Sequence, residues 1–305
     1  MKLFDLHCDT LVECLRTGQS LWKNSCQLDV SRGLRYSPWI QCFAVWISDE
    51  ARGAEATGIF DRAFSLLQRE LQSRPEMKLV TSGKDLQAVK PGQCGVLLTV
   101  ESGAAAAGSL EQLRRLYRCG VRMMTLTWNG ENEIGGGILS ARPSGLTAFG
   151  KAAVAEMERL SMVIDLSHAS ERLFYSVAEA SSGPLAASHS NARAVCGHPR
   201  NLTDEQFRLI CDRGGIVGLN LAPEFLSSGK ASGEDVLRHA EHFLSLGGES
   251  ALAIGSDFDG TSLPEGICGI ESMEELAEIF LRHNYPEALV MQIFFENAYK
   301  FFQFL

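Results

Sequence analysis

Two short apolar segments, each followed by Ser-His, constrain the fold of this chain more than any other feature. Residues 162–166 (MVIDL) lead into a Ser-His pair that ends at His168, and residues 185–187 (LAA) lead into one that ends at His189. Such short apolar runs are typical of buried parallel strands, and residues 171–180 between them have helical composition. The segment therefore predicts a β-α-β unit. It places two imidazoles at the C-terminal ends of adjacent strands, where catalytic groups lie in parallel α/β proteins.

The same alternation of strand and helix runs through the whole chain. Eight segments have the pattern of buried strands: residues 2–6, 39–47, 95–100, 121–128, 162–166, 185–187, 215–219 and 252–256. Helices are predicted at residues 11–17, 53–73, 83–89, 110–119, 147–160, 171–180, 203–213, 232–246, 271–282 and 286–302. This order predicts an α/β fold, a (β/α)8 TIM barrel of the metal-dependent hydrolase type, with a doubly wound open sheet as the competing architecture. Closure is favoured because only a closed barrel brings the first strand, with its ligand-type residues, beside the last.

Composition limits the classes of partner and compartment. The 305 residues show no repeat, low-complexity segment or linker, so we expect a single barrel domain over residues 1–305. A net charge of −9 argues against nucleic acid and anionic membrane as partners. Nine scattered cysteines without a C-x-x-C pair fit a reducing cytoplasm better than a disulfide framework. The N-terminus shows no signal peptide and no apolar run is long enough to span a membrane, so we expect a cytoplasmic protein.

Residues that can bind a metal follow five of the predicted strands. They are His7 and Asp9 on the first, Glu101 on the third, His168 on the fifth, His189 on the sixth and Asp257 on the eighth. Because side chains two residues apart share one face of a strand, His7 and Asp9 can hold one ion together. Three imidazoles and three carboxylates suit zinc or a similar divalent ion, and six ligands are too many for one catalytic zinc. The set predicts two metal ions bridged by a carboxylate, for which Glu101 is the natural candidate, and a hydroxide.

Each of these residues taken alone has an ordinary explanation. His7 and Asp9 fit a polar loop pair, Glu101 fits a turn cap, and Asp257 fits an Asp-rich turn. Their shared position at strand ends favours the metal site. Asp165 lies inside the fifth strand, and we interpret it as a buried residue that supports the ligands.

Six segments resemble the membrane dipeptidase (renal dipeptidase) family of zinc peptidases, within the wider amidohydrolase-type metal barrels. They are DLHCDT (5–10), VESG (100–103), LTWNGEN (126–132), IDLSHAS (164–170), SHSNARAVCGHPRNLTDEQ (188–206) and GSDFDG (255–260). Their order and spacing match the family over nearly the whole chain, and residues 188–206 are the most specific. The resemblance implies a barrel with a binuclear zinc centre that hydrolyses dipeptides, including those with a C-terminal D-residue. It also implies a homodimer.

The resemblance implies a role for each ligand. His7 and Asp9 would hold one zinc, Glu101 would bridge the two ions, and His168 and His189 would hold the other.

The resemblance also implies residues that handle the substrate. Asp257 would lie by the first zinc and take the proton of the bridging water. Arg200 would bind the substrate's C-terminal carboxylate, a role that suits the planar fork of a guanidinium. The chain departs from the family at Trp128, where a substrate-contacting His is common. Trp128 can donate an N–H or form an apolar wall but carries no charge, and Asn129 can partly replace the donor, so substrate range and rate are affected more than reaction class.

Two other functions fit the same residues. Another metal-dependent amidohydrolase would act on cyclic amides, lactones or nucleobases, and cleavage of a blocked dipeptide amide would favour it, whereas Arg200 favours a free acid. A metal-binding barrel without turnover is the third possibility. Trp128 supports that possibility, and the six filled metal positions count against it.

Overall fold

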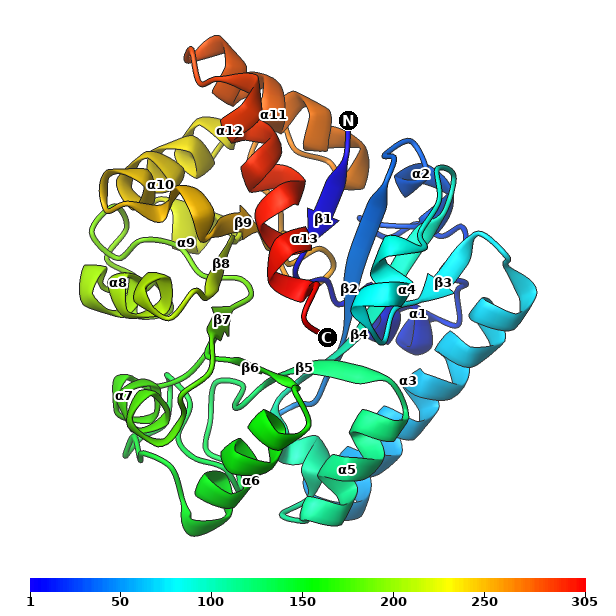
Figure 1. The fold of residues 1–305 in the computed structure, drawn as a ribbon, viewed down its shortest axis with the longest axis vertical. Coiled ribbons are helices and arrows are strands. Elements are labelled where there is room, and N and C mark those ends of the chain that lie inside the picture. Colours follow the sequence, from blue (N-terminus) through cyan, green and yellow to red (C-terminus); the bar gives the residue numbers. More distant parts are fainter.

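The computed structural model describes residues 1–305, in which nine parallel strands form one sheet (Figure 1). The strands are β1 (Leu3–Asp5), β2 (Trp39–Trp46), β3 (Met77–Leu79), β4 (Cys94–Glu101), β5 (Val121–Thr125), β6 (Val163–Asp165), β7 (Leu185–Ala187), β8 (Ile216–Leu219) and β9 (Leu252–Ile254). Eight of them close into a barrel because β2 pairs with both β1 and β4, and β1 pairs with β9. The predicted (β/α)8 barrel is therefore confirmed.

The remaining strand, β3, is not part of the closed barrel. It pairs with the first three residues of β4, whereas β5 pairs with the last four. The sequence pattern predicts no strand there, because three residues are too few to show a strand period. Backbone pairing with the longer strand β4 holds this short segment in a strand conformation.

Helices surround the barrel on its outside (Figure 1). They are α1 (Thr10–Thr17), α2 (Val30–Gly33), α3 (Gly53–Ser73), α4 (Gly83–Gln87), α5 (Leu110–Arg118), α6 (Ala148–Arg159), α7 (Glu171–Ala180), α8 (Asp204–Asp212), α9 (Pro223–Leu226), α10 (Gly233–Ser245), α11 (Met273–Arg282), α12 (Glu287–Met291) and α13 (Asn297–Phe302). Thr203, the first residue of the predicted helix 203–213, is the N-cap of α8 and forms a capping box with Gln206. None of the helices combines the length and the apolar character that crossing a membrane needs.

The C-terminal segment closes the end of the barrel at which the strands begin. The sequence predicts one helix over residues 286–302, but a π-helical turn, Gln292–Glu296, separates α12 from α13. The wider turn changes the helical period between Phe294 and Phe295 in the turn and Phe301 and Phe302 in α13, and all four rings are buried. Phe302 stacks on Phe4 of β1 with ring centroids 5.4 Å apart. The candidate functional residues lie at the opposite end of the barrel, where the strands finish.

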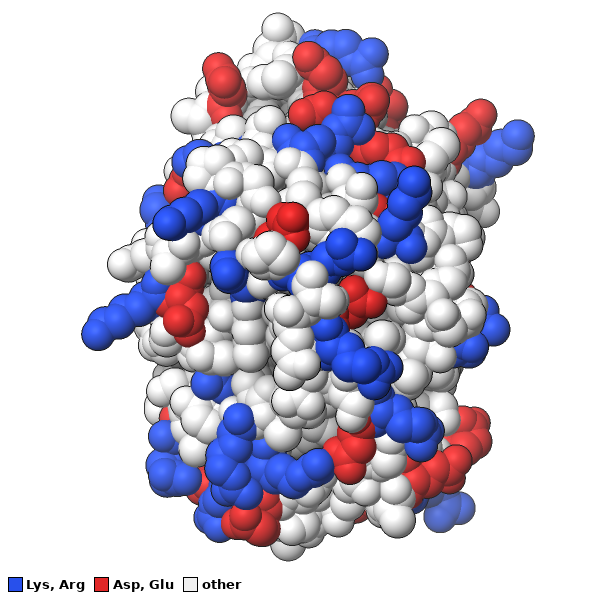
Figure 2. All heavy atoms as spheres, turned by 90° about the vertical axis from the view of Figure 1, so that its right-hand side faces the viewer, with Lys and Arg blue, Asp and Glu red and all other residues white.

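Basic and acidic side chains are interspersed on the face that carries α3 (Figure 2). Arg115 of α5, for example, reaches Asp61 of α3 at 2.5 Å. Exposed pairs of this kind contribute little to stability, roughly 0–1 kcal/mol each. The apolar residues that α3 turns inward, such as Phe60 and Leu67, are what hold it against the barrel.

Candidate metal centre

The structure brings all six predicted ligands together at the C-terminal ends of the strands. His7 follows β1, Asp9 precedes α1, Glu101 ends β4, His168 follows β6, His189 follows β7 and Asp257 follows β9. Their donor atoms form three overlapping groups, each with all atoms within 4.8 Å: His7, His189 and Asp257; Glu101, His168 and His189; His7, Asp9 and Glu101. The three groups overlap pairwise, at His7, His189 and Glu101, so a cation bound by one group would share a ligand with each of the others.

Glu101 lies at the centre of the cluster and reaches all three imidazoles. Its Oε1 atom is 2.9 Å from His168 Nε2 and 3.6 Å from His189 Nε2. Its Oε2 atom is 3.6 Å from His7 Nε2, which is also 3.5 Å from Asp9 Oδ2. A carboxylate whose two oxygens face different imidazoles has the geometry of a bridge between two metal positions.

The outer nitrogens of two histidines are fixed by hydrogen bonds. His168 Nδ1 donates to Asn129 Oδ1 at 2.9 Å. His189 Nδ1 donates to the Ser188 hydroxyl at 2.7 Å, and that hydroxyl donates to the buried Asp165 at 2.6 Å. With the proton on Nδ1, each ring directs the lone pair of Nε2 into the cluster, as a metal ligand requires.

Two of the candidate ligands have a strained backbone conformation. His168 and Asp257 adopt φ angles of +65° and +62°, in the left-handed region that residues other than glycine rarely occupy. Gly260 lies directly against the carboxylates: a Cβ atom there would lie 2.2 Å from Asp9 Oδ2 and 2.5 Å from Asp257 Oδ1. The glycine of the GSDFDG segment is therefore required for the close approach of this loop.

The buried charges shift the pKa values of the cluster. Burial alone would raise the pKa of Glu101, but the charge of His7 and the close approach of the other two imidazoles hold it well below its ordinary value. Burial alone would lower the pKa of His7, yet Glu101 and Asp9 raise it well above. Burial, with the nearby carboxylates, raises the pKa of Asp257 to about 7 and that of Asp9 to about 6. Three carboxylates so close together need positive charge.

The donor set fits a divalent cation such as zinc. His7 Nε2 and Asp9 Oδ1 are buried and have no hydrogen-bond partner, although buried polar atoms normally have one. Imidazole nitrogens and carboxylate oxygens are ligands that zinc accepts. A cation among these atoms would give both of them a partner and balance the charge of the carboxylates.

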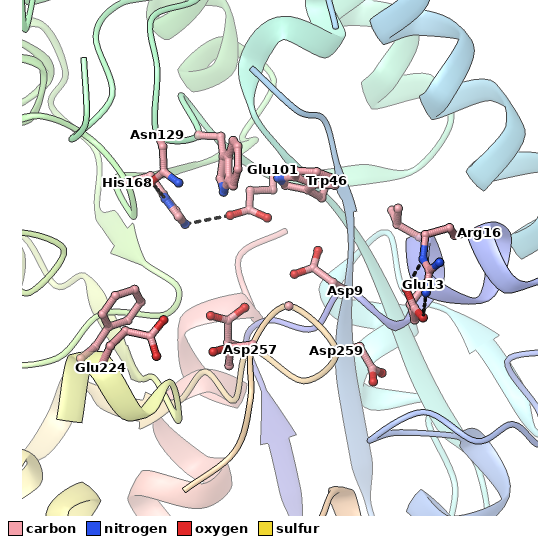
Figure 3. A pocket seen from close by; sticks show the side chains of 15 residues that line it. Asp9, Glu13, Arg16, Trp46, Glu101, Asn129, His168, Glu224, Asp257 and Asp259 are labelled. Atoms are coloured by element: carbon pink, nitrogen blue, oxygen red, sulfur yellow. Dashed lines mark hydrogen bonds and ion pairs between the residues drawn. The ribbon is translucent and has the colours of Figure 1, made fainter. Parts of the chain in front are cut away.

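A pocket of about 500 Å³ opens onto the cluster, a size typical of small-ligand sites (Figure 3). Trp128 forms part of its wall and packs edge-on against Trp46, with ring centroids 5.0 Å apart. The Glu13–Arg16 ion pair of α1 and the Glu224 side chain of α9 line opposite sides of the mouth. Trp128 is therefore placed as an aromatic wall, the apolar alternative considered for it.

Arg200 lies beside the cluster rather than in the lining of the large pocket. It is only 5% exposed and borders a small cavity that also touches His168. Its Nη2 donates to the carbonyl of His189 at 3.1 Å and its Nη1 to the Ser190 hydroxyl at 3.3 Å, while Nε has no partner. The guanidinium lies 5.4 Å from the ring of Phe225, which does line the pocket. An unpaired buried N–H leaves capacity to bind an anion.

Sequence reasoning missed several residues of this site. Trp46 ends β2 and faces Trp128, and α9 contributes Glu224 and Phe225. The Pro at the first position of α9 was a usable signal for that short helix. Asn129 was considered only as a donor to substrate, whereas its side chain contacts His168.

Comparison with known proteins agrees with this geometry. The profile of the membrane dipeptidase family (peptidase family M19) matches residues 1–304. Rat dipeptidase 3 is 32% identical over 271 residues, which cover 86% of this chain and 55% of that protein. The chain thus spans about half the length of this mammalian relative.

Two solved structures are similar over almost their whole length. The dipeptidase AC, an M19 metallopeptidase, is 29% identical with a TM-score of 0.93, and the match covers 99% of this chain and 98% of that one. A metallopeptidase from Rhodobacter sphaeroides, solved with a phosphinate mimic of the dipeptide L-Ala-D-Ala, is 29% identical with a TM-score of 0.91. That match covers 99% of each chain.

Proposed function

This chain belongs to the membrane dipeptidase family, peptidase family M19, and from that premise we propose that it is a zinc-dependent dipeptidase with two metal ions. The observation that supports the binuclear site best is the position of Glu101, whose two oxygens face three imidazoles. The substrates proposed are dipeptides, including those with a C-terminal D-residue. The Rhodobacter relative, solved with a mimic of L-Ala-D-Ala, supports that extension.

Different residues of the chain bind the metal ions and transfer the proton during hydrolysis. His7, Asp9, Glu101, His168 and His189 would hold the zinc ions, which in such sites supply hydroxide near neutral pH and polarise the scissile carbonyl. Asp257 accepts the proton of the attacking water and returns it to the leaving amine. Asn220 Nδ2 donates to Asp257 Oδ2 at 3.0 Å, while Oδ1 faces His7 at 3.8 Å. The hydrogen bond orients the carboxylate for this transfer.

The test combines metal content with a small substrate panel. The purified protein should contain about two zinc ions per chain and cleave L-Ala-L-Ala and L-Ala-D-Ala, and a chelator should remove both metal and activity. The same dipeptides as C-terminal amides should be poor substrates. Metal without cleavage of any dipeptide would contradict the proposed function and direct attention to other amidohydrolase substrates.

Replacement of Arg200 by alanine is expected to raise KM for free dipeptides about tenfold or more with a smaller change in kcat, because a charged hydrogen bond to the carboxylate is lost. Steady-state kinetics on L-Ala-L-Ala and its amide measure the effect. The matched control is Arg208→Ala on α8, which removes a guanidinium from an exposed position outside the Arg200 loop. Equal effects on acid and amide would remove Arg200 from carboxylate binding.

A further inference from the structure

Each ring nitrogen of His239 binds the backbone of a different segment. His239 lies on α10 and is completely buried. The Ala192 N–H donates to Nδ1 at 3.0 Å, and Nε2 donates to the Leu226 carbonyl at 3.0 Å. A backbone N–H only donates and a carbonyl only accepts, so these partners fix one neutral tautomer. Burial lowers the pKa of His239 to about 4, which keeps the ring neutral near pH 7.

The two segments held by His239 form the side of the site where Arg200 lies. Ala192 lies in the loop that follows β7 and includes Arg200. Leu226 ends α9, whose Phe225 lines the pocket and faces the guanidinium of Arg200. Asn201, next to Arg200, donates to the Phe225 carbonyl at 2.8 Å. The loop and α9 thus form one wall, and His239 ties both parts of it to α10.

We propose that His239 is a positioning residue for the carboxylate end of the substrate, acting through Arg200. Without the ring, a buried N–H and a buried carbonyl would lose their partners, and the segments would have to shift to satisfy them. The Arg200 loop would then be less well placed to meet the carboxylate. This inference rests on the proposed function, and it assigns a substrate-binding effect to a residue that does not touch the pocket.

Two conservative substitutions of His239 each remove one of its two hydrogen bonds and keep the other. In His239→Asn, Oδ1 can take the place of Nδ1 and accept from Ala192, but the donor to Leu226 is lost. In His239→Gln, Nε2 can take the place of the ring Nε2 and donate to Leu226, but the acceptor for Ala192 is lost. KM for L-Ala-L-Ala is expected to rise about fivefold in His239→Gln, the size of one hydrogen bond, with kcat within about twofold. His239→Asn should stay within about twofold of wild type.

The control is His242→Gln, which lies one turn further along α10. His242 Nε2 binds Asp204 at 2.8 Å and so joins α10 to α8, away from the pocket wall. Its kinetics should match those of the wild type. Thermal unfolding of all variants separates loss of stability from loss of affinity.

A double-mutant cycle with Arg200→Ala tests whether His239 acts through Arg200. The rise in KM caused by His239→Gln should disappear in the Arg200→Ala background. The same rise in both backgrounds, or an unchanged KM in His239→Gln despite a lower Tm, would overturn the proposal and indicate a purely structural residue. Wild-type protein that cleaves no dipeptide would instead overturn the proposed function, and the inference with it.

Discussion

Replacement of Glu101 by glutamine is expected to lower kcat/KM for dipeptides about a thousandfold or more, equivalent to about 4 kcal/mol of transition-state stabilisation. The amide keeps the size of the side chain but removes the negative charge that faces His7, His168 and His189. Its NH2 group also places protons where a metal would need a lone pair. Both metal positions should therefore weaken together, so bound zinc, measured by atomic emission, should fall along with activity.

The control for this change is Glu111→Gln on the exposed surface of α5. Glu111 pairs with Arg118 at 2.7 Å on the exposed surface, where ion pairs contribute little to stability. Activity and metal content should equal those of the wild type. A Glu101→Gln variant that kept two zinc ions and full activity would exclude Glu101 as the bridge and leave the site with separate ligand sets.

Much of the fold follows from local patterns in the sequence. Short apolar runs such as residues 162–166 end in a polar pair, and this repeated pattern indicates parallel strands with functional residues at one edge. The closed barrel then explains how His7 from the first strand and Asp257 from the last reach one cluster. The six candidate ligands could be proposed from the sequence because each ends a recognisable strand or follows one within a few residues.

The contacts that organise the site were less accessible, because they join segments far apart in the chain. Nothing near Asn129 in the sequence indicates that its amide would hold the outer nitrogen of His168. The burial of Arg200 against Phe225 depends on α9, a helix of four residues that is too short for a periodic pattern. The role of each ligand, the cytoplasmic location and the homodimer stay predictions.

Replacement of Asp257 by asparagine should separate metal binding from proton transfer. Asparagine adopts the left-handed backbone that this position requires, and its amide oxygen can still accept from Asn220. The loop should therefore keep its conformation. What the variant loses is the ability to take a proton from water and deliver it to the leaving amine, so kcat should fall about 10²–10⁴-fold, the usual contribution of a general acid–base. Zinc content should stay close to that of the wild type.

Asp259→Asn is the matched control, because Asp259 lies in the same loop and also has a left-handed φ, +67°. Its carboxylate accepts from Thr10 Oγ1 and from the backbone of Gln27, so it supports the mouth of the pocket without facing His7. Its effect on kcat should be less than about tenfold, since it removes neither a metal ligand nor a proton acceptor. Loss of zinc in Asp257→Asn would make Asp257 chiefly a ligand. A wild-type kcat would assign the proton transfer to another group, for which the candidate is Glu101, the carboxylate that faces all three imidazoles.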